Sequence, residues 1–125
     1  MQYESLTDAE LKEALLLKER LNILNKRDGC QATFMSFIEH IWPEFICGRH
    51  HKIFAQKLED IATGKINRLI INMPPRHTKS EFASTYFPAW IMGKFPNKKI
   101  MQTTHTGELA ARFGRKVRNM MDTKE

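Results

Sequence analysis

The sequence is poor in cysteine, has no long apolar run and lacks an excess of acidic residues. Its two cysteines, Cys30 and Cys47, form no Cys-x-x-Cys pair, so neither a zinc site nor a dithiol redox site is predicted. No stretch approaches the ~20 consecutive apolar residues that cross a bilayer. Residues 1–5 also lack the basic-then-apolar order of a secretory signal. We therefore expect a cytosolic protein without a membrane partner.

The charge balance favours an acidic partner. The 125 residues carry a net charge of +6, with 20 Lys and Arg against 14 Asp and Glu. Such a charge favours binding to nucleic acid or nucleotide and says nothing about fold. The basic residues are dense in the last third of the chain, although a solvated helix face is the ordinary explanation of such a run.

Apolar periodicity predicts helices alternating with strands in the second half of the chain. Helices are expected over residues 5–26, 33–41, 50–63 and 107–121, and from residue 79 up to a kink or restart at Pro88. Thr7 and Glu10 have the spacing of a capping box, and Asp28-Gly29 is expected to close the first helix. Strands are expected over residues 68–71 and 99–104. This alternation predicts an α/β fold with a parallel sheet. Two strands give a parallel sheet too little surface to bury on both faces, so we expect the chain to be part of a longer protein.

The most informative segment joins the first predicted strand to a helix. Residues 72–81 read Asn-Met-Pro-Pro-Arg-His-Thr-Lys-Ser-Glu. Strand, loop, Lys-Ser and helix is the order found in nucleotide phosphate sites, where loop amides and a helix N-terminus bind anions. The two glycine positions of the common pattern hold Met73 and Thr78, so only Lys-Ser matches. A solvated Lys-Ser at an ordinary helix start is the alternative. Either Thr78 relaxes into β-region geometry or it weakens nucleotide binding.

Three segments resemble the large subunits of tailed-phage terminases, the DNA-packaging motors. Residues 72–81 are similar to the variant Walker A loop of that family, which usually reads Pro-Pro-Arg-His-Gly-Lys-Ser-Glu. Residues 87–96, beginning Phe-Pro-Ala-Trp, and residues 113–118, Phe-Gly-Arg-Lys-Val-Arg, are similar to two further family segments. The resemblance covers roughly residues 37–121, and several linked motifs in order are more specific than one loop.

The resemblance implies a partial P-loop NTPase domain of the RecA-like type, with helices flanking a parallel sheet. Residues 1–48 would be an N-terminal helical region and 49–125 the first part of the ATPase domain, without the acidic Walker B strand or the nuclease domain. The whole protein would be an ATPase and endonuclease that translocates double-stranded DNA into the prohead. This chain alone is expected to be inactive. Implied partners are the portal protein, the small terminase subunit and further copies in a ring, in the host cytoplasm and transiently at the prohead portal.

Two groups of residues are expected to bind ligands. Lys79 is the predicted catalytic residue at the β/γ-phosphates of ATP, and Ser80 is the predicted Mg²⁺ ligand. The full set expected to bind nucleotide is Arg76, His77, Thr78, Lys79, Ser80 and, upstream on a helix, Gln56. The set expected to contact DNA phosphates is Thr104, His105, Arg112, Arg115 and Arg118.

Two other functions stay open. One is a self-contained basic module that binds nucleic acid, with its Lys-Ser loop on backbone phosphate and no nucleotide chemistry. The other is a different P-loop enzyme such as a kinase, which the Phe-Pro-Ala-Trp and Phe-Gly-Arg segments disfavour.

Overall fold

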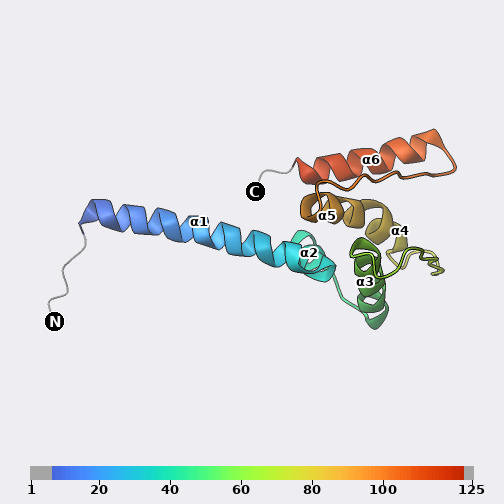
Figure 1. Cartoon of the computed structure of the whole chain (residues 1–125), viewed down its shortest axis with the longest axis horizontal. Helices are drawn as coiled ribbons and strands as arrows, with labels where there is room; N and C mark the ends of the chain where they lie inside the picture. The colour runs from blue at the N-terminus through green and yellow to red at the C-terminus, as the bar shows by residue number, and fades with distance from the viewer. Residues whose placement is uncertain (1–6, 123–125) are drawn as a thin grey trace.

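The computed structural model describes residues 7–122, which form helices joined by irregular segments (Figure 1). The elements are α1 (Asp8–Ala32), α2 (Phe34–Ile41), α3 (Arg49–Ala62), α4 (Lys79–Glu81), the π-helical turn η1 (Phe82–Tyr86), α5 (Phe87–Lys94) and α6 (Gly107–Met121). Because α4, η1 and α5 follow one another without a gap, they make one continuous helical run over residues 79–94. In Figure 1, α1 extends away from the other helices.

The predicted α/β fold, a P-loop domain with a parallel sheet, is wrong for this structure. Residues 7–122 contain no strand, and no main-chain hydrogen bond between them joins segment 68–71 to segment 99–104. The side chains of segment 69–73 nevertheless alternate between the core and solvent, with the period of two that is expected of a strand. Leu69, Ile71 and Met73 pack against the core, whereas Ile70 between them is 87% exposed. A strand also needs a hydrogen-bonded neighbour, and the side-chain pattern alone does not supply one.

α1 is capped as predicted and ends later than predicted. The carboxylate of Glu10 accepts hydrogen bonds from the Thr7 main-chain N–H at 2.8 Å and from the Thr7 hydroxyl at 2.7 Å, which confirms the capping box. The expected stop at Asp28-Gly29 is wrong, because the helix continues to Ala32. Thr33 ends it in extended backbone, and its hydroxyl accepts the Ser36 N–H at 3.1 Å to begin α2. No residue of α1 is buried.

The core lies where α2, α3 and the helical run 79–94 meet. Phe34 of α2 and Phe82 of η1 are fully buried, with ring centroids 5.7 Å apart in an edge-to-face arrangement. Burying an aromatic side chain of this size contributes about 1.5–3 kcal/mol. The other buried residues of this cluster are Ile38, Phe54, Ala55, Leu58, Ala62, Trp90 and Ile91.

Polar groups from distant parts of the chain pair with helix ends around this core. Glu59 of α3 accepts the Phe34 N–H at 2.7 Å. Lys94 donates to the Ala32 carbonyl at 2.9 Å, and Lys98 donates to the Ala62 carbonyl. Because the last carbonyls of a helix have no internal donor, the two lysines satisfy the C-terminal ends of α1 and α3.

Pro88 is accommodated inside the helical run by the π-helical turn. The Phe87 N–H donates to the Phe82 carbonyl, five residues back. Proline has no N–H, so the Ser84 carbonyl loses the donor that a regular helix would supply. Gln102 replaces it, because its side-chain amide donates to the Ser84 carbonyl at 3.2 Å. The helix therefore continues past Pro88, and segment 99–104 is attached to it.

Candidate functional site

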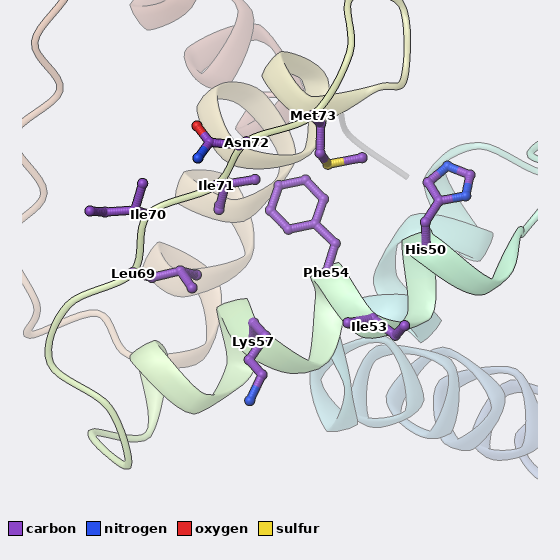
Figure 2. A pocket seen from close by; sticks show the side chains of 9 residues that line it. All are labelled: His50, Ile53, Phe54, Lys57, Leu69, Ile70, Ile71, Asn72 and Met73. Carbon is purple, nitrogen blue, oxygen red and sulfur yellow. The ribbon is translucent and has the colours of Figure 1, made fainter.

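The Lys-Ser loop, residues 74–80, connects segment 69–73 to the helical run that begins at Lys79. Figure 2 shows segment 69–73 running beside α3. The two elements line an open, mainly apolar hollow of about 290 Å³, with Met73 at the end next to the loop and His50 on the α3 side. The loop is thus positioned by a helix and by a segment that packs on the core.

The backbone of the loop has two non-glycine residues in the left-handed region. Arg76 has φ 65°, and Thr78 has φ 59° and ψ 6°. Thr78 is followed directly by the helical residue Lys79. Successive residues of opposite hand direct their main-chain N–H groups into one concavity, which is an anion-binding arrangement. Of the two alternatives for Thr78, relaxation into β-region geometry is contradicted by these angles, and weaker nucleotide binding stays a prediction. Thr78 keeps the conformation for which glycine is suited, at a cost of about 1–2 kcal/mol.

A histidine from α3 holds the Thr78 side chain. His51 is only 7% exposed, and its Nε2 lies 2.9 Å from the Thr78 hydroxyl. Its Nδ1 accepts the Gly48 N–H at 2.9 Å. The Thr78 hydroxyl also donates to the His77 carbonyl at 2.6 Å. Burial lowers the pKa of His51, and His50 and His77 lower it further.

Three polar side chains of the loop have no partner among residues 7–122. The side chains of Arg76, Lys79 and Ser80 make no hydrogen bond or ion pair with any described residue. Lys79 is half-buried at the start of the helical run, whereas Arg76 and Ser80 are exposed. His77 lies with Nδ1 3.0 Å from the Pro75 carbonyl, so that nitrogen donates within the loop. An ammonium, a guanidinium and a hydroxyl are thus available to a phosphate and its metal ion.

α6 is joined to the first turn of the helical run. Lys116 Nζ lies 2.8 Å from a carboxylate oxygen of Glu81. The same carboxylate, together with burial as the larger cause, raises the pKa of Tyr86. The Phe-Gly-Arg-Lys segment and the Lys-Ser loop, which are distant in the sequence, are therefore neighbours in the structure.

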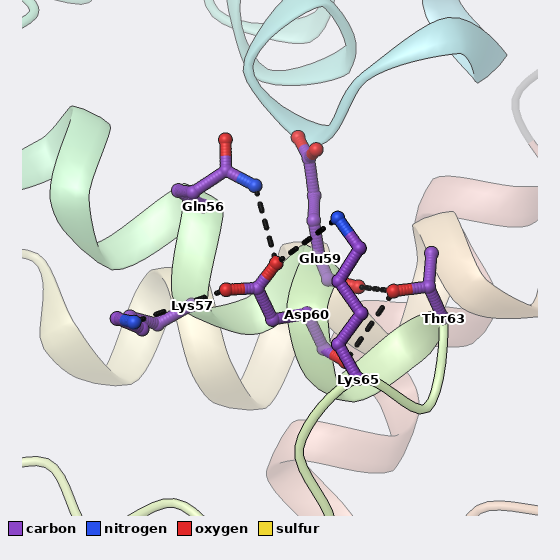
Figure 3. Close-up of polar contacts among 6 residues, drawn as sticks. All are labelled: Gln56, Lys57, Glu59, Asp60, Thr63 and Lys65. Atoms are coloured by element: carbon purple, nitrogen blue, oxygen red, sulfur yellow. Dashed lines mark hydrogen bonds and ion pairs between the residues drawn. The ribbon is translucent and has the colours of Figure 1, made fainter.

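Gln56 lies away from the Lys-Ser loop. Its amide nitrogen is 3.3 Å from a carboxylate oxygen of Asp60, which is also 3.7 Å from Lys65 Nζ (Figure 3). The α3 residues that line the hollow beside the loop are His50, Ile53, Phe54 and Lys57, a stripe at helical spacing that excludes Gln56. The structure thus brings the five expected loop residues together and places the sixth elsewhere.

The residues expected to contact DNA are only partly brought together. His105 and Arg112 line a second hollow of about 240 Å³, with Thr106, Glu108 and Leu109. Thr104 donates to the Thr106 carbonyl at 2.7 Å, next to this hollow. Arg115 and Arg118 are exposed further along α6 and do not line it.

No role was assigned to His51 from the sequence. Within α3 the ring of His51 at N3 accepts the N-cap Gly48 N–H, but Gly-x-x-His is not the Ser/Thr-x-x-Glu/Gln pattern of a capping box, so the sequence carries no clear signal for it. The contact to Thr78, 27 residues away, is tertiary and no local pattern encodes it.

Between residues 7 and 122, no three His, Cys, Asp or Glu side chains gather into a group that could hold a metal ion. No helix in the same range combines the length and the apolar character needed to cross a bilayer.

Comparison with known proteins found no matching family model, no matching curated protein and no matching solved structure.

Proposed function

We propose that the Lys-Ser loop binds the triphosphate of ATP together with Mg²⁺, as the nucleotide-binding part of a viral DNA-packaging motor of the terminase large subunit type. The observation that carries the proposal is the change of hand between Thr78 and Lys79 beside an ammonium group that has no partner among the described residues. A loop of this conformation gathers main-chain N–H groups toward an anion, and the lysine adds a full positive charge.

Each loop residue has a distinct role in this proposal. Lys79 binds the β- and γ-phosphates and stabilises the charge that develops on them during transfer. Ser80 presents its hydroxyl as a ligand for Mg²⁺, which would neutralise phosphate oxygens when bound. Arg76 adds positive charge at a loop in which Pro74 and Pro75 contribute no N–H donors.

The assignment to a packaging motor rests on the resemblance, and the packing of the three segments supports it. The Phe-Pro-Ala-Trp segment forms α5 and buries Trp90 in the core. The Phe-Gly-Arg-Lys segment lies on α6 and reaches Glu81 beside the Lys-Ser loop. Double-stranded DNA, the portal protein, the small terminase subunit and a ring of copies are the proposed partners.

A nucleotide titration tests the proposal. Binding of a fluorescent ATP analogue is measured with and without Mg²⁺ for the parent and for Lys79→Ala. The matched control is Lys99→Ala, which removes an exposed lysine outside the loop. We expect Mg²⁺-dependent binding that ADP competes for, a loss of about tenfold or more in Lys79→Ala because a charge-assisted contact disappears, and no loss in the control. Equal affinities of the parent and Lys79→Ala would contradict the proposal.

A nucleic-acid-binding module without nucleotide chemistry is the second candidate. The observation that favours it is the exposed series Arg112, Arg115 and Arg118 on α6, with His105 beside Arg112. Contacts of this kind grip backbone phosphate without reading sequence. DNA affinity that is identical with and without MgATP, in a chain that binds no ATP, would favour this candidate over the first.

A further inference from the structure

The hydrogen bonds around His51 have only one consistent direction. Nδ1 faces the Gly48 N–H at 2.9 Å and must accept from it, so a neutral His51 ring carries its proton on Nε2. Nε2 then donates to the Thr78 hydroxyl at 2.9 Å. The Thr78 hydroxyl donates its own proton to the His77 carbonyl at 2.6 Å, because a carbonyl oxygen can only accept. This series of hydrogen bonds runs from the first turn of α3 into the Lys-Ser loop.

This series of hydrogen bonds reaches Thr78, the strained residue of the loop. Thr78 is β-branched and lies in the left-handed region at φ 59°. Such a conformation persists only where the surroundings hold it. Its hydroxyl accepts one bond from His51 and donates another to its own loop. Both bonds are made in the observed conformation.

We propose that neutral His51 is a positioning residue for the Lys-Ser loop, which holds Thr78 in the left-handed conformation, and that protonation of His51 releases the loop. The inference rests on the proposed function, because the conformation it protects is the one that gathers loop amides toward a phosphate. His51 itself touches no phosphate in this account. It acts through Thr78.

Protonation of His51 takes place at Nδ1, on the side of the ring away from Thr78. A proton on Nδ1 turns that nitrogen into a donor facing the Gly48 N–H, so two donors oppose each other and the bond is lost. The ring must then move to find an acceptor, and Nε2 moves with it away from Thr78. The titratable groups facing His51 are His50 of α3, with ring centroids 3.8 Å apart, and His77 of the loop, which lies near His50. Phe45 and Phe82 face it from the other elements and carry no charge.

The direction of the pH effect follows from these surroundings. Burial and the two neighbouring histidines lower the pKa of His51 below its ordinary value of 6.5. Since the folded protein favours the neutral ring and the unfolded chain binds the proton more readily, the stabilising contribution is complete above about pH 6.5. It is lost as the pH falls from there through the lowered pKa.

Nuclear magnetic resonance tests the contact without any ligand. At pH 7.5 the ring nitrogens of His51 should show Nε2 protonated and Nδ1 unprotonated, and the Cα shift of Thr78 should be that of left-handed backbone. As the pH falls, the Thr78 signals should move with the same midpoint as the His51 ring. A ring protonated on Nδ1 at pH 7.5, or Thr78 signals that ignore the titration of His51, would overturn the proposal.

Variants separate positioning from a merely structural role. In His51→Phe, which keeps a ring, the Thr78 signals should leave the left-handed range, whereas in the matched control His50→Phe they should stay. If His51→Phe does not fold, Thr78→Val removes the same bond from the loop side and should shift the His51 ring signals. Unchanged Thr78 signals in His51→Phe together with unchanged His51 ring signals in Thr78→Val would refute the proposal.

Nucleotide binding supplies the second readout. We expect His51→Phe to weaken MgATP binding about tenfold in the parent, the worth of one well-placed hydrogen bond, and to have little effect in Thr78→Gly, where glycine adopts the loop conformation unaided. Thr78→Gly also isolates the pH dependence of ATP itself, because His51 no longer contributes there. An equal loss in both backgrounds would contradict positioning through Thr78. If the parent binds no ATP at any pH, the proposed function fails, while the Thr78 signals still decide the role of His51.

Discussion

Thr78 stands where the backbone takes up a conformation that glycine reaches at little cost. The observed φ of 59° therefore represents strain that the fold has to offset. Two hydrogen bonds of its hydroxyl, with His51 and with the His77 carbonyl, supply the offset. Replacing the residue can remove the strain, the bonds, or both, which makes its contributions separable.

Two substitutions at position 78 should differ in stability. Thr78→Gly removes the left-handed strain and the hydroxyl together, so the free energy of unfolding should stay within about 1 kcal/mol of the parent. Thr78→Val keeps a β-branch in the left-handed region and loses the bonds, so it should unfold more easily by about 1–2 kcal/mol. Urea unfolding at pH 7.5 measures both. A valine variant as stable as the threonine parent would show that the hydroxyl bonds of Thr78 do not stabilise the fold.

At the scale of elements, Pro88 sits inside the helix that leads away from the candidate site. The π-helical turn and the amide of Gln102 together let the helix pass the proline. Gln102 belongs to a segment without secondary structure, so this bond also attaches that segment to the helix.

Removing the Gln102 amide should destabilise the protein modestly. Gln102→Ala leaves the half-buried Ser84 carbonyl without its donor, which costs about 1 kcal/mol of unfolding free energy. The neighbouring Thr103→Ala, at an exposed position, is the control and should change little. Thermal unfolding of the two variants decides the matter, and equal midpoints would show that water satisfies the carbonyl equally well.

The sequence predicts the helices far better than the arrangement between them. Helix 107–121 was predicted with the bounds that are observed, and the start of α1 follows from Thr7 and Glu10. Segment 68–71 shows why a sheet was predicted wrongly: the alternation of inward and outward side chains is real, yet a period of two does not provide a pairing partner. The loop conformation was also out of reach, because the His51 contact that supports it spans 27 residues.

Across the described residues, α6 carries a series of exposed positive charges. Arg112, Arg115 and Arg118 lie exposed along α6, while Lys116 on the same helix is paired with Glu81. The three arginines are thus available to an anionic polymer, and the lysine is engaged within the protein. Contacts of arginine with DNA phosphate release counterions, which makes the affinity depend on salt.

Replacing the three α6 arginines with glutamine should flatten that salt dependence. Each phosphate contact contributes about 0.9 to the slope of log affinity against log salt concentration, so the slope should fall by up to about 3. The control replaces Lys12, Lys18 and Lys26, exposed on α1, and removes the same charge. Fluorescence anisotropy of duplex DNA at several salt concentrations provides the measurement. Equal slopes for the two triple variants would assign the effect to net charge alone.

In the proposed function, the main-chain amides of the Lys-Ser loop bind the triphosphate of ATP. Amide nuclear magnetic resonance during a MgATP titration tests this binding most directly. We expect the signals of residues 76–80 to move together and to saturate with a single affinity, and Lys79→Ala to abolish the movement. Saturable ATP binding that moves other amides and leaves residues 76–80 unchanged would contradict the proposed function.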